Sequence, residues 1–110
     1  MKIAMPVQSG KLSQHFGHSE QFSLFEVEDK SIQSREDVTP PAHEPGLLPR
    51  WLRERGVTLV IAGGMGHRAQ MIFEEAGIHV ICGAPSESPD VVVDSYLKGN
   101  LETGDNACDH

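Results

Sequence analysis

The sequence predicts an α/β layered domain with a mixed five-stranded sheet, in the element order β-β-β-α-β-α-β-α. Two observations lead to this fold class. Apolar runs without alternation, such as Leu59–Ala62, are typical of strands buried on both faces of a sheet. Helical patterns precede the last two strands, and such crossovers imply parallel pairing with right-handed connections.

The first part of the chain contains three predicted strands and no helix. Lys2–Val7 is predicted to form a buried strand, and the polar stretch Ser9–Gln21 is expected to be a loop. Phe22–Glu28 and the polar stretch Ser31–Val38 flank a short turn, which predicts an antiparallel hairpin with its second strand at the sheet edge. The proline-rich segment Thr39–Gly46 cannot form a helix or a central strand.

The second part alternates helices and strands. Leu48, Trp51 and Leu52 share a face at helical spacing, and Gly56 suits the position after that helix. The remaining predicted elements are the strand Val57–Ala62, a helix from about Gly66 that stops at Gly77, the strand Ile78–Cys82, and a helix that starts at Ser88-Pro89-Asp90 and stops at Gly99. Residues 1–100 are therefore expected to form one domain, and residues 101–110 a polar C-terminal tail.

Composition and charge exclude several classes of function. The 16 acidic and 9 basic residues give a formal charge of −7, so there is no basic surplus for nucleic acid or an anionic membrane surface. No apolar run approaches the roughly 20 residues of a membrane-spanning helix. The N-terminus lacks the apolar region of a signal peptide, and we expect a cytoplasmic protein. Two cysteines are too few for a disulfide scaffold.

The most informative stretch is the glycine turn, residues 63–66, between a predicted buried strand and a predicted helix. Gly63, Gly64 and Gly66 are expected to allow positive φ and the close approach of a ligand. The helix that follows directs its free N–H groups and positive dipole end at this turn, which favours an anion. The alternative is a tight connection between strand and helix that binds nothing.

Three loops are predicted to meet at one edge of the sheet, because ligands of open α/β sheets bind outside the carboxyl ends of the strands. These loops are Gln8 to Gln21, Gly63 to Arg68, and Gly83 to Ser88. Side chains of types that bind metals or anions would then lie together at this edge: His15, His18, His67, Arg68 and Cys82. A ten-residue tail spans about 33 Å when extended, so Cys108 and His110 are within reach of the same edge.

Each of these residues also has a simpler interpretation. The histidines at 15 and 18 could belong to a solvated loop, Arg68 could be a surface charge, and Cys82 could be a core residue. The pair Cys108 and His110 is a weak signal alone, because a stable zinc site needs about four ligands.

The sequence lacks the complete motifs of several enzyme classes. Residues 64–69 match the dinucleotide pattern G-x-G-x-x-A, but the acidic residue expected at the end of the next strand is absent. No lysine of a phosphate-binding loop lies near these glycines, and no G-x-S-x-G motif occurs. With no visible set of nucleophile, base and orienting group, we expect a protein that is not an enzyme. Backbone N–H groups, imidazoles, an arginine and thiols suit an anionic, sulfur-rich metal species.

Motifs along nearly the whole chain, in order, match those of a known family. They are Lys2-Ile3-Ala4-Met5-Pro6, Ser13-x-His15-Phe16-Gly17, Ile61-Ala62-Gly63-Gly64-Met65-Gly66, Glu75-Ala76-Gly77-Ile78, Tyr96-x-x-Gly99-x-Leu101, and Gly104-Asp105-Asn106-x-Cys108. In these motifs the chain resembles the dinitrogenase iron–molybdenum cofactor biosynthesis family, as a small stand-alone member.

The resemblance implies a ribonuclease-H-like fold with a mixed five-stranded sheet flanked by helices. It also implies non-catalytic binding, carriage or delivery of a metal–sulfur cluster that contains molybdenum with iron or copper. One branch, the orange proteins of anaerobes, is associated with a molybdenum–copper sulfide cluster. The implied partners are the cluster or its precursor and a cofactor-assembly protein.

Several residues become candidates for cluster binding through this resemblance. His15, Phe16, Gly17, Gly63, Gly64, Met65 and Gly66 belong to the family's motifs by position. His18, His67 and Arg68 lie beside these motifs and are additional candidates; many members lack histidine at the first two positions. The candidate metal ligands are His15, His18, Cys108 and His110.

A second hypothesis keeps the same edge but changes what binds there. The chain would then be a regulatory or interaction module that binds a phosphate-bearing small ligand or a partner ATPase. The sequence leaves this alternative open.

Overall fold

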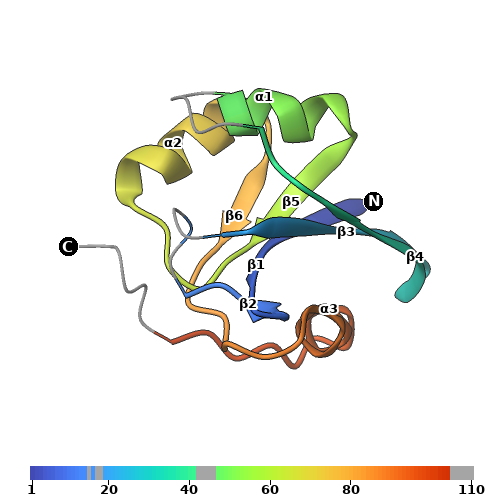
Figure 1. Ribbon diagram of the computed structural model, residues 1–110. Helices are drawn as coiled ribbons and strands as arrows, with labels where there is room; N and C mark the ends of the chain where they lie inside the picture. The colour runs from blue at the N-terminus through green and yellow to red at the C-terminus, as the bar shows by residue number, and fades with distance from the viewer. Residues whose placement is uncertain (15, 17–18, 42–46, 105–110) are drawn as a thin grey trace.

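The computed structural model describes residues 1–14, 16, 19–41 and 47–104. Its sheet lies between two layers of helices (Figure 1). Helices α1 (Leu47–Glu54) and α2 (His67–Glu75) cover one face, and α3 (Pro89–Leu97) covers the other. The strands are β1 (Lys2–Gln8), β2 (Lys11–Leu12), β3 (Gln21–Glu28), β4 (Ser31–Val38), β5 (Val57–Ile61) and β6 (His79–Ile81).

The sheet confirms the predicted fold class. Its strand order is β4-β3-β1-β5-β6. The strands β1, β5 and β6 are parallel neighbours, whereas β1–β3 and β3–β4 pair antiparallel, as predicted for three parallel strands with a hairpin at one side. We call the end of the sheet where β1, β5 and β6 finish the carboxyl edge.

The sheet has one strand more than the five predicted. The short strand β2 pairs with the end of β1, through Val7 with Leu12 and Gln8 with Lys11, inside a stretch expected to be loop. The turn between them has positive φ at both Ser9 and Gly10, 55° and 78°. Positive φ at both central residues is typical of the tight hairpin turn that matches strand twist. A strand of two residues is too short to show alternation in the sequence.

Two hydrophobic clusters fill the two faces of the sheet. The first lies under α1 and α2 and includes Phe22, Leu52 and Phe73. The second lies under α3 and includes Met5 and Val93. Residues 3–7 of β1 are all buried, as expected for a central strand covered on both faces. Among the helices of the described residues, none has the length and hydrophobicity needed to cross a bilayer.

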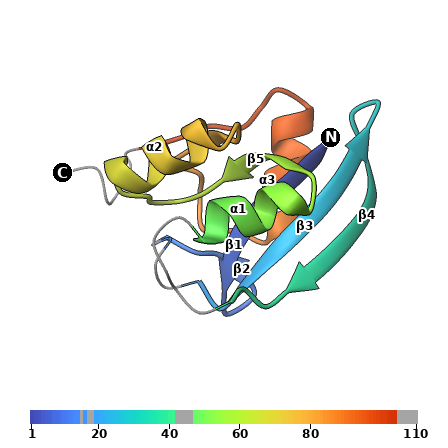
Figure 2. The same ribbon diagram turned by 90° about the horizontal axis from the view of Figure 1, so that it is seen from above.

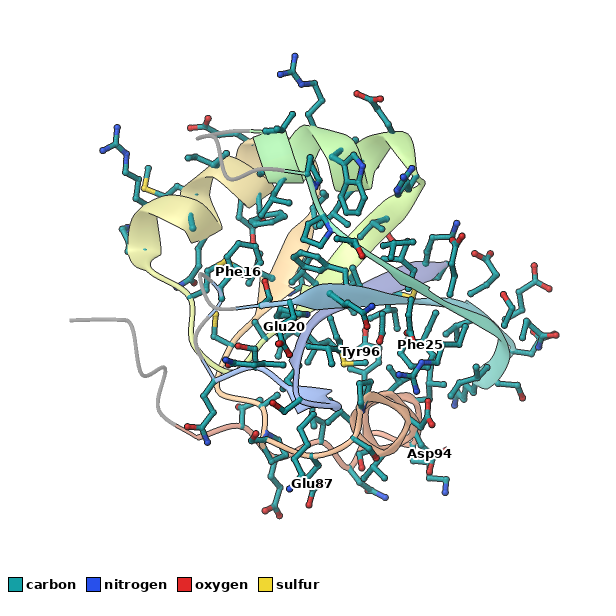
Figure 3. The ribbon with its side chains drawn as sticks, in the orientation of Figure 1. Phe16, Glu20, Phe25, Glu87, Asp94 and Tyr96 are labelled. Carbon is teal, nitrogen blue, oxygen red and sulfur yellow. The ribbon has the colours of Figure 1, made fainter. Side chains whose placement is uncertain are left out.

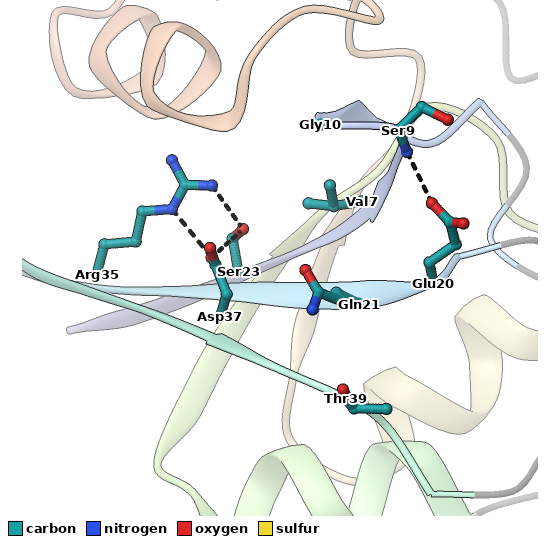
Figure 4. Close-up of a pocket in the computed structure, with 9 residues that line it drawn as sticks. All are labelled: Val7, Ser9, Gly10, Glu20, Gln21, Ser23, Arg35, Asp37 and Thr39. Carbon is teal, nitrogen blue, oxygen red and sulfur yellow. Dashed lines mark hydrogen bonds and ion pairs between the residues drawn. The ribbon is translucent and has the colours of Figure 1, made fainter.

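The edge strand β4 lies beyond the helix layers (Figure 2) and is exposed along almost its whole length, as predicted. An ionic network ties it to β3 and α3. Arg35 donates from Nε to Asp37 Oδ1 (3.0 Å), from Nη1 to Asp90 Oδ1 (2.7 Å) and from Nη2 to Ser23 Oγ (3.2 Å). The hydroxyl of Ser23, a buried residue, donates to Asp37 Oδ1 at 2.7 Å (Figure 4).

This network sets the ionisation of Asp37. Burial alone would raise the pKa of its carboxyl group. The hydrogen bonds from Ser23 and Arg35, together with the positive charge of Arg35, outweigh burial and hold the pKa of Asp37 below its ordinary value. Asp37 therefore stabilises the folded chain in its charged form.

We predict that Asp37→Asn lowers the free energy of unfolding by about 0.5–1 kcal/mol at pH 7, the scale of a partly exposed ion pair. A carboxyl group with a depressed folded pKa stabilises the protein above its unfolded pKa, and this contribution is lost as the pH falls through the folded pKa. Urea titrations at several pH values should show the difference between variant and wild type shrinking below about pH 4.

The matched control is Glu36→Gln on the same strand, since the described residues show no ion pair for Glu36. It should change stability little at any pH. A cost of Asp37→Asn that stays the same from pH 7 to pH 3 would contradict the role of the charged carboxylate.

Candidate functional site

Three loops meet at the carboxyl edge, as the sequence predicted. The backbone N–H of Phe16, after β2, donates to the carbonyl of Gly64, after β5 (2.9 Å). The N–H of Gly83, after β6, donates to the carbonyl of Gly63 (2.7 Å). The N–H of Leu12 donates to the carbonyl of Glu87 (2.8 Å), so the first and third loops are also joined. Segments far apart in the sequence are thus linked backbone to backbone.

Position 63 must be glycine because another part of the same backbone passes very close to it. A Cβ atom at Gly63 would lie 2.8 Å from the carbonyl oxygen of Ser13 and 2.9 Å from the Cα of Gln14. Real Cβ atoms essentially never come so near to backbone atoms. Residues 13–14 therefore cross directly over Gly63, and only glycine leaves room for them.

The expected positive φ in the glycine turn is wrong. The glycines with positive φ in the described part of the chain are Gly10, Gly56, Gly77, Gly83 and Gly99. Gly66 has extended backbone, with φ −61° and ψ 151°. The chain leaves β5 and enters α2 without a left-handed residue, so the turn needs its glycine at 63 for space and not for an unusual dihedral angle.

Phe16 anchors the first loop. Its half-buried ring packs edge-on against Phe22 (5.7 Å between centroids) and Phe73 (5.5 Å), in the cluster under α1 and α2 (Figure 3). Phe16 was predicted to bind the cluster, but its ring contacts show that it holds the loop in place. Its neighbours His15, Gly17 and His18 lie outside the described residues.

At the glycine turn, the groups available to a ligand are the backbone and the side chains in the first turn of α2. Met65 is fully buried, so any part it has in binding must come from its backbone. Gly66 is the N-cap of α2; it makes no side-chain capping bond, and the first turn of the helix has no acidic residue. His67 and Arg68 are exposed in that turn. A helix N-terminus of this kind, beside an arginine, favours an anion.

Gln70 is a supporting residue that sequence analysis missed. Its Nε2 donates to the carbonyl of Met65 at 2.8 Å, which holds the glycine turn against α2. A glutamine inside a helix gives no sequence signal of this contact.

The C-terminal tail returns to the carboxyl edge. Leu101 packs against the cluster under α3, and the N–H of Gly104 donates to the carbonyl of Gly83 at 2.7 Å. Cys108 and His110 follow in the segment outside the described residues. Cys82 is half-buried and packs against the cluster under α1 and α2, in agreement with its interpretation as a core residue.

The described residues alone contain no group of three or more His, Cys, Asp or Glu side chains that could hold a metal ion. His15, His18, Cys108 and His110 lie outside that search. His79 is exposed at the start of β6, away from the carboxyl edge, with its Nδ1 3.5 Å from Glu74 Oε1. The described part of the edge thus offers backbone donors, an imidazole and a guanidinium.

A separate cavity of about 420 Å³ lies over β3 and β4 (Figure 4). Its cationic group, Arg35, already pairs with Asp37 and Asp90. Glu20 in its wall accepts the N–H of Ser9 at 2.8 Å. Because these charges are balanced within the protein, this cavity is a poorer anion site than the carboxyl edge.

We predict that serine is tolerated at Gly66 and not at Gly63. Nothing lies within 4 Å of a Cβ atom at Gly66, and a serine N-cap gains a few tenths of a kcal/mol over glycine. Gly63→Ser must displace the backbone of Ser13 and Gln14, and we expect a loss of about 1–3 kcal/mol in unfolding free energy. Urea titration of the two variants measures the difference, and equal stabilities would contradict the crossing at Gly63.

The chain is similar to proteins of known sequence and structure. A family model described as dinitrogenase iron-molybdenum cofactor matches residues 1–99. The uncharacterized protein MJ0580 of Methanocaldococcus jannaschii is 34% identical over 107 residues, which cover 93% of this chain and 90% of that protein. The crystal structure of PH0822 aligns with a TM-score of 0.86 at 30% identity, over 94% of both chains. The apo form of the orange protein from Desulfovibrio gigas has the same fold, with a TM-score of 0.71 at 21% identity, over 96% of this chain and 93% of that one. The chain therefore belongs to the dinitrogenase iron-molybdenum cofactor family.

Proposed function

We propose that this protein binds and delivers an anionic metal–sulfur cluster, of molybdenum with iron or copper, and catalyses no reaction. The observation that carries the proposal is the joining of two segments at the carboxyl edge. Ser13 and Gln14, which precede His15 in the sequence, cross Gly63, and Phe16 donates its N–H to the carbonyl of Gly64, beside the start of α2, which has no side-chain cap. The family of the chain is related to the iron–molybdenum cofactor, which agrees with a role in cofactor assembly.

The donor set suits an anion that contains sulfide. Backbone N–H groups and the Arg68 guanidinium hydrogen-bond sulfides or oxo groups and offset their charge. We propose that the imidazoles of His15 and His18 bind a metal of the cluster, and that His67 contacts it from the start of α2. Imidazole is a ligand for iron and copper. Gly66, half-buried at the N-cap with nothing within 4 Å of its Cβ position, leaves space at the start of α2.

A carrier also needs a source and a recipient. We propose that a cofactor-assembly protein supplies or accepts the cluster, and that the exchange takes place in the cytoplasm. The exposed side chains of His67 and Arg68 at the rim of the sheet support such a role, because loops on a rigid scaffold can hold a ligand without enclosing it.

The test is anaerobic reconstitution with tetrathiomolybdate plus copper(I), or plus iron(II). We expect a visible absorption band and stoichiometric molybdenum in the purified protein. His15→Ala removes a proposed ligand and should weaken cluster binding by more than about 10-fold, since loss of an outer-shell partner alone costs about 10- to 100-fold. His79→Ala is the matched control, because His79 is exposed at the other end of β6. A colourless protein without stoichiometric metal would refute the proposal.

The pH dependence of binding reports how the histidines act. Imidazole must be neutral to bind a metal, so affinity should fall as the pH drops below about 6.5. Absorbance titrations between pH 5 and 8 measure this. Affinity that rises on acidification would instead indicate that protonated histidines hold the anion by charge.

A second candidate is a module that binds a phosphate-bearing ligand or a partner ATPase. The observation in its favour is the same uncapped helix start with Arg68 in its first turn. Phosphate or nucleotide should then raise the melting temperature without metal, and a ligand at 100 times its Kd adds about 2.7 kcal/mol of stability. No shift across a panel of nucleotides would exclude this candidate.

A further inference from the structure

The exposed side of helix α1 is positively charged, although the chain as a whole is acidic. The helix and the two residues after it contain Arg50, Arg53 and Arg55 and a single acidic residue, Glu54, whereas the formal charge of the chain is −7. All three arginines are exposed, and the buried side of α1 is apolar and packs toward the sheet. We call the three arginines, together with Trp51 between them, the arginine face.

The charge of the arginine face is not balanced by ion pairs within the described part of the chain. No ion pair there joins one of its arginines to a carboxylate. Other cations of the protein differ in this respect. Arg35 pairs with Asp37 and Asp90, and Lys98 pairs with Asp94. The guanidinium groups of the arginine face are therefore available to carboxylates from outside the molecule.

Two of these guanidinium groups are held in place by contacts with the protein. The Cζ of Arg55 lies 4.3 Å from the centre of the Trp51 ring, and that ring packs edge-on against Phe22 at 6.3 Å between centroids. The guanidinium of Arg53 lies beside Gly77, where a Cβ atom would be 3.7 Å from the Cζ of Arg53. Groups that are positioned in advance lose less conformational freedom when they bind a partner.

The arginine face lies at the opposite end of the parallel strands from the carboxyl edge. Arg55 is two residues before β5 begins at Val57. Gly77, beside Arg53, is two residues before β6 begins at His79. The five residues of β5 run from this end toward the carboxyl edge (Figure 1) and span about 16 Å. A segment of another protein can therefore bind the arginine face without covering the carboxyl edge.

The chemistry of the arginine face favours carboxylates of a protein. The planar guanidinium group donates two parallel hydrogen bonds to a carboxylate, and arginine and tryptophan are enriched among the residues that dominate binding energy at protein interfaces. Nucleic acid fits less well. Arg55 already covers a face of the Trp51 ring on which a base would stack, and the chain has no basic surplus to neutralise a run of phosphates.

We propose that the arginine face is a docking surface for an acidic segment of another protein. Attraction between exposed charges raises the rate of encounter and is screened by salt, which suits a short-lived contact. This inference goes beyond the proposed function, since it names a second surface, and it does not depend on a bound cluster.

The surface is located with an oligoglutamate peptide as the probe, added to the full chain without metal. NMR spectra of the isotope-labelled protein should show shifts of the backbone amides of residues 50–56 and 77–79, and not of residues 63–68. Fluorescence anisotropy of the labelled peptide should show an affinity that falls at least about tenfold between about 0.05 M and about 0.5 M salt. Absence of binding at low salt, or shifts confined to residues 63–68, would overturn the proposal.

A pair of double variants separates the position of the charge from its amount. Arg53→Gln with Arg55→Gln should weaken peptide binding about three- to tenfold, the combined effect of two exposed ion pairs. Lys11→Gln with Lys30→Gln is the matched control, because it removes two exposed positive charges from other elements and gives the same net charge. The control should bind the peptide as the wild type does. Equal losses in the two double variants would mean that only net charge matters and would overturn the docking surface.

An oligodeoxythymidylate of the same charge as the peptide tests the other class of partner. It should bind more weakly than the peptide, and tighter binding at residues 50–56 would assign this surface to nucleic acid and overturn the proposal. Because all of these titrations are made without metal, a chain that binds no cluster can still bind the peptide. A chain that binds the cluster and not the peptide would leave the carrier function standing and refute the docking surface.

Discussion

Direct contact between backbones at Gly63 and Gly83 is the constraint on which the carboxyl edge depends. Ser13 and Gln14 cross over Gly63, Gly83 bonds to Gly63, and Gly104 bonds to Gly83. These contacts join four segments that are distant in the sequence. A side chain at either glycine would separate the backbones and move a loop away from the edge.

The edge combines neutral supporting side chains with exposed candidate binding groups. Phe16 is held by Phe22 and Phe73, and Gln70 holds the carbonyl of Met65. His67 and Arg68 remain exposed beside them. Binding groups that are positioned in advance lose less conformational entropy when a ligand arrives. The side chains of these supports are neutral and at least half-buried, so they can hold the loop in place whatever the charge of the ligand.

The fold could be predicted because the patterns that indicate it extend over whole elements. These patterns are the apolar runs at β1 and β5, the polar edge strand, and helices that end at a glycine. The sequence predicted that a ligand approaches the glycine turn closely, and at Gly63 the approaching group is instead the backbone of Ser13 and Gln14. That contact joins residues about fifty positions apart and leaves no local pattern. The left-handed glycine at the edge is Gly83, whose partner Gly104 lies beyond a whole helix. The bond from Gln70 to Met65 depends on a rotamer and is equally invisible in a sequence.

An acidic protein can hold an anion because charge acts locally. Residues 21–38, the β3–β4 hairpin, carry five acidic and two basic residues, whereas residues 57–73 carry one arginine and no acid. Ions screen charges over about 8–10 Å, so the hairpin hardly weakens hydrogen bonds at the start of α2. The network of Arg35 with Asp37 and Asp90 also leaves no unpaired guanidinium there to compete for an anion. The five acidic residues of the hairpin disfavour an anion there, which agrees with the proposal that an anionic cluster binds at the carboxyl edge.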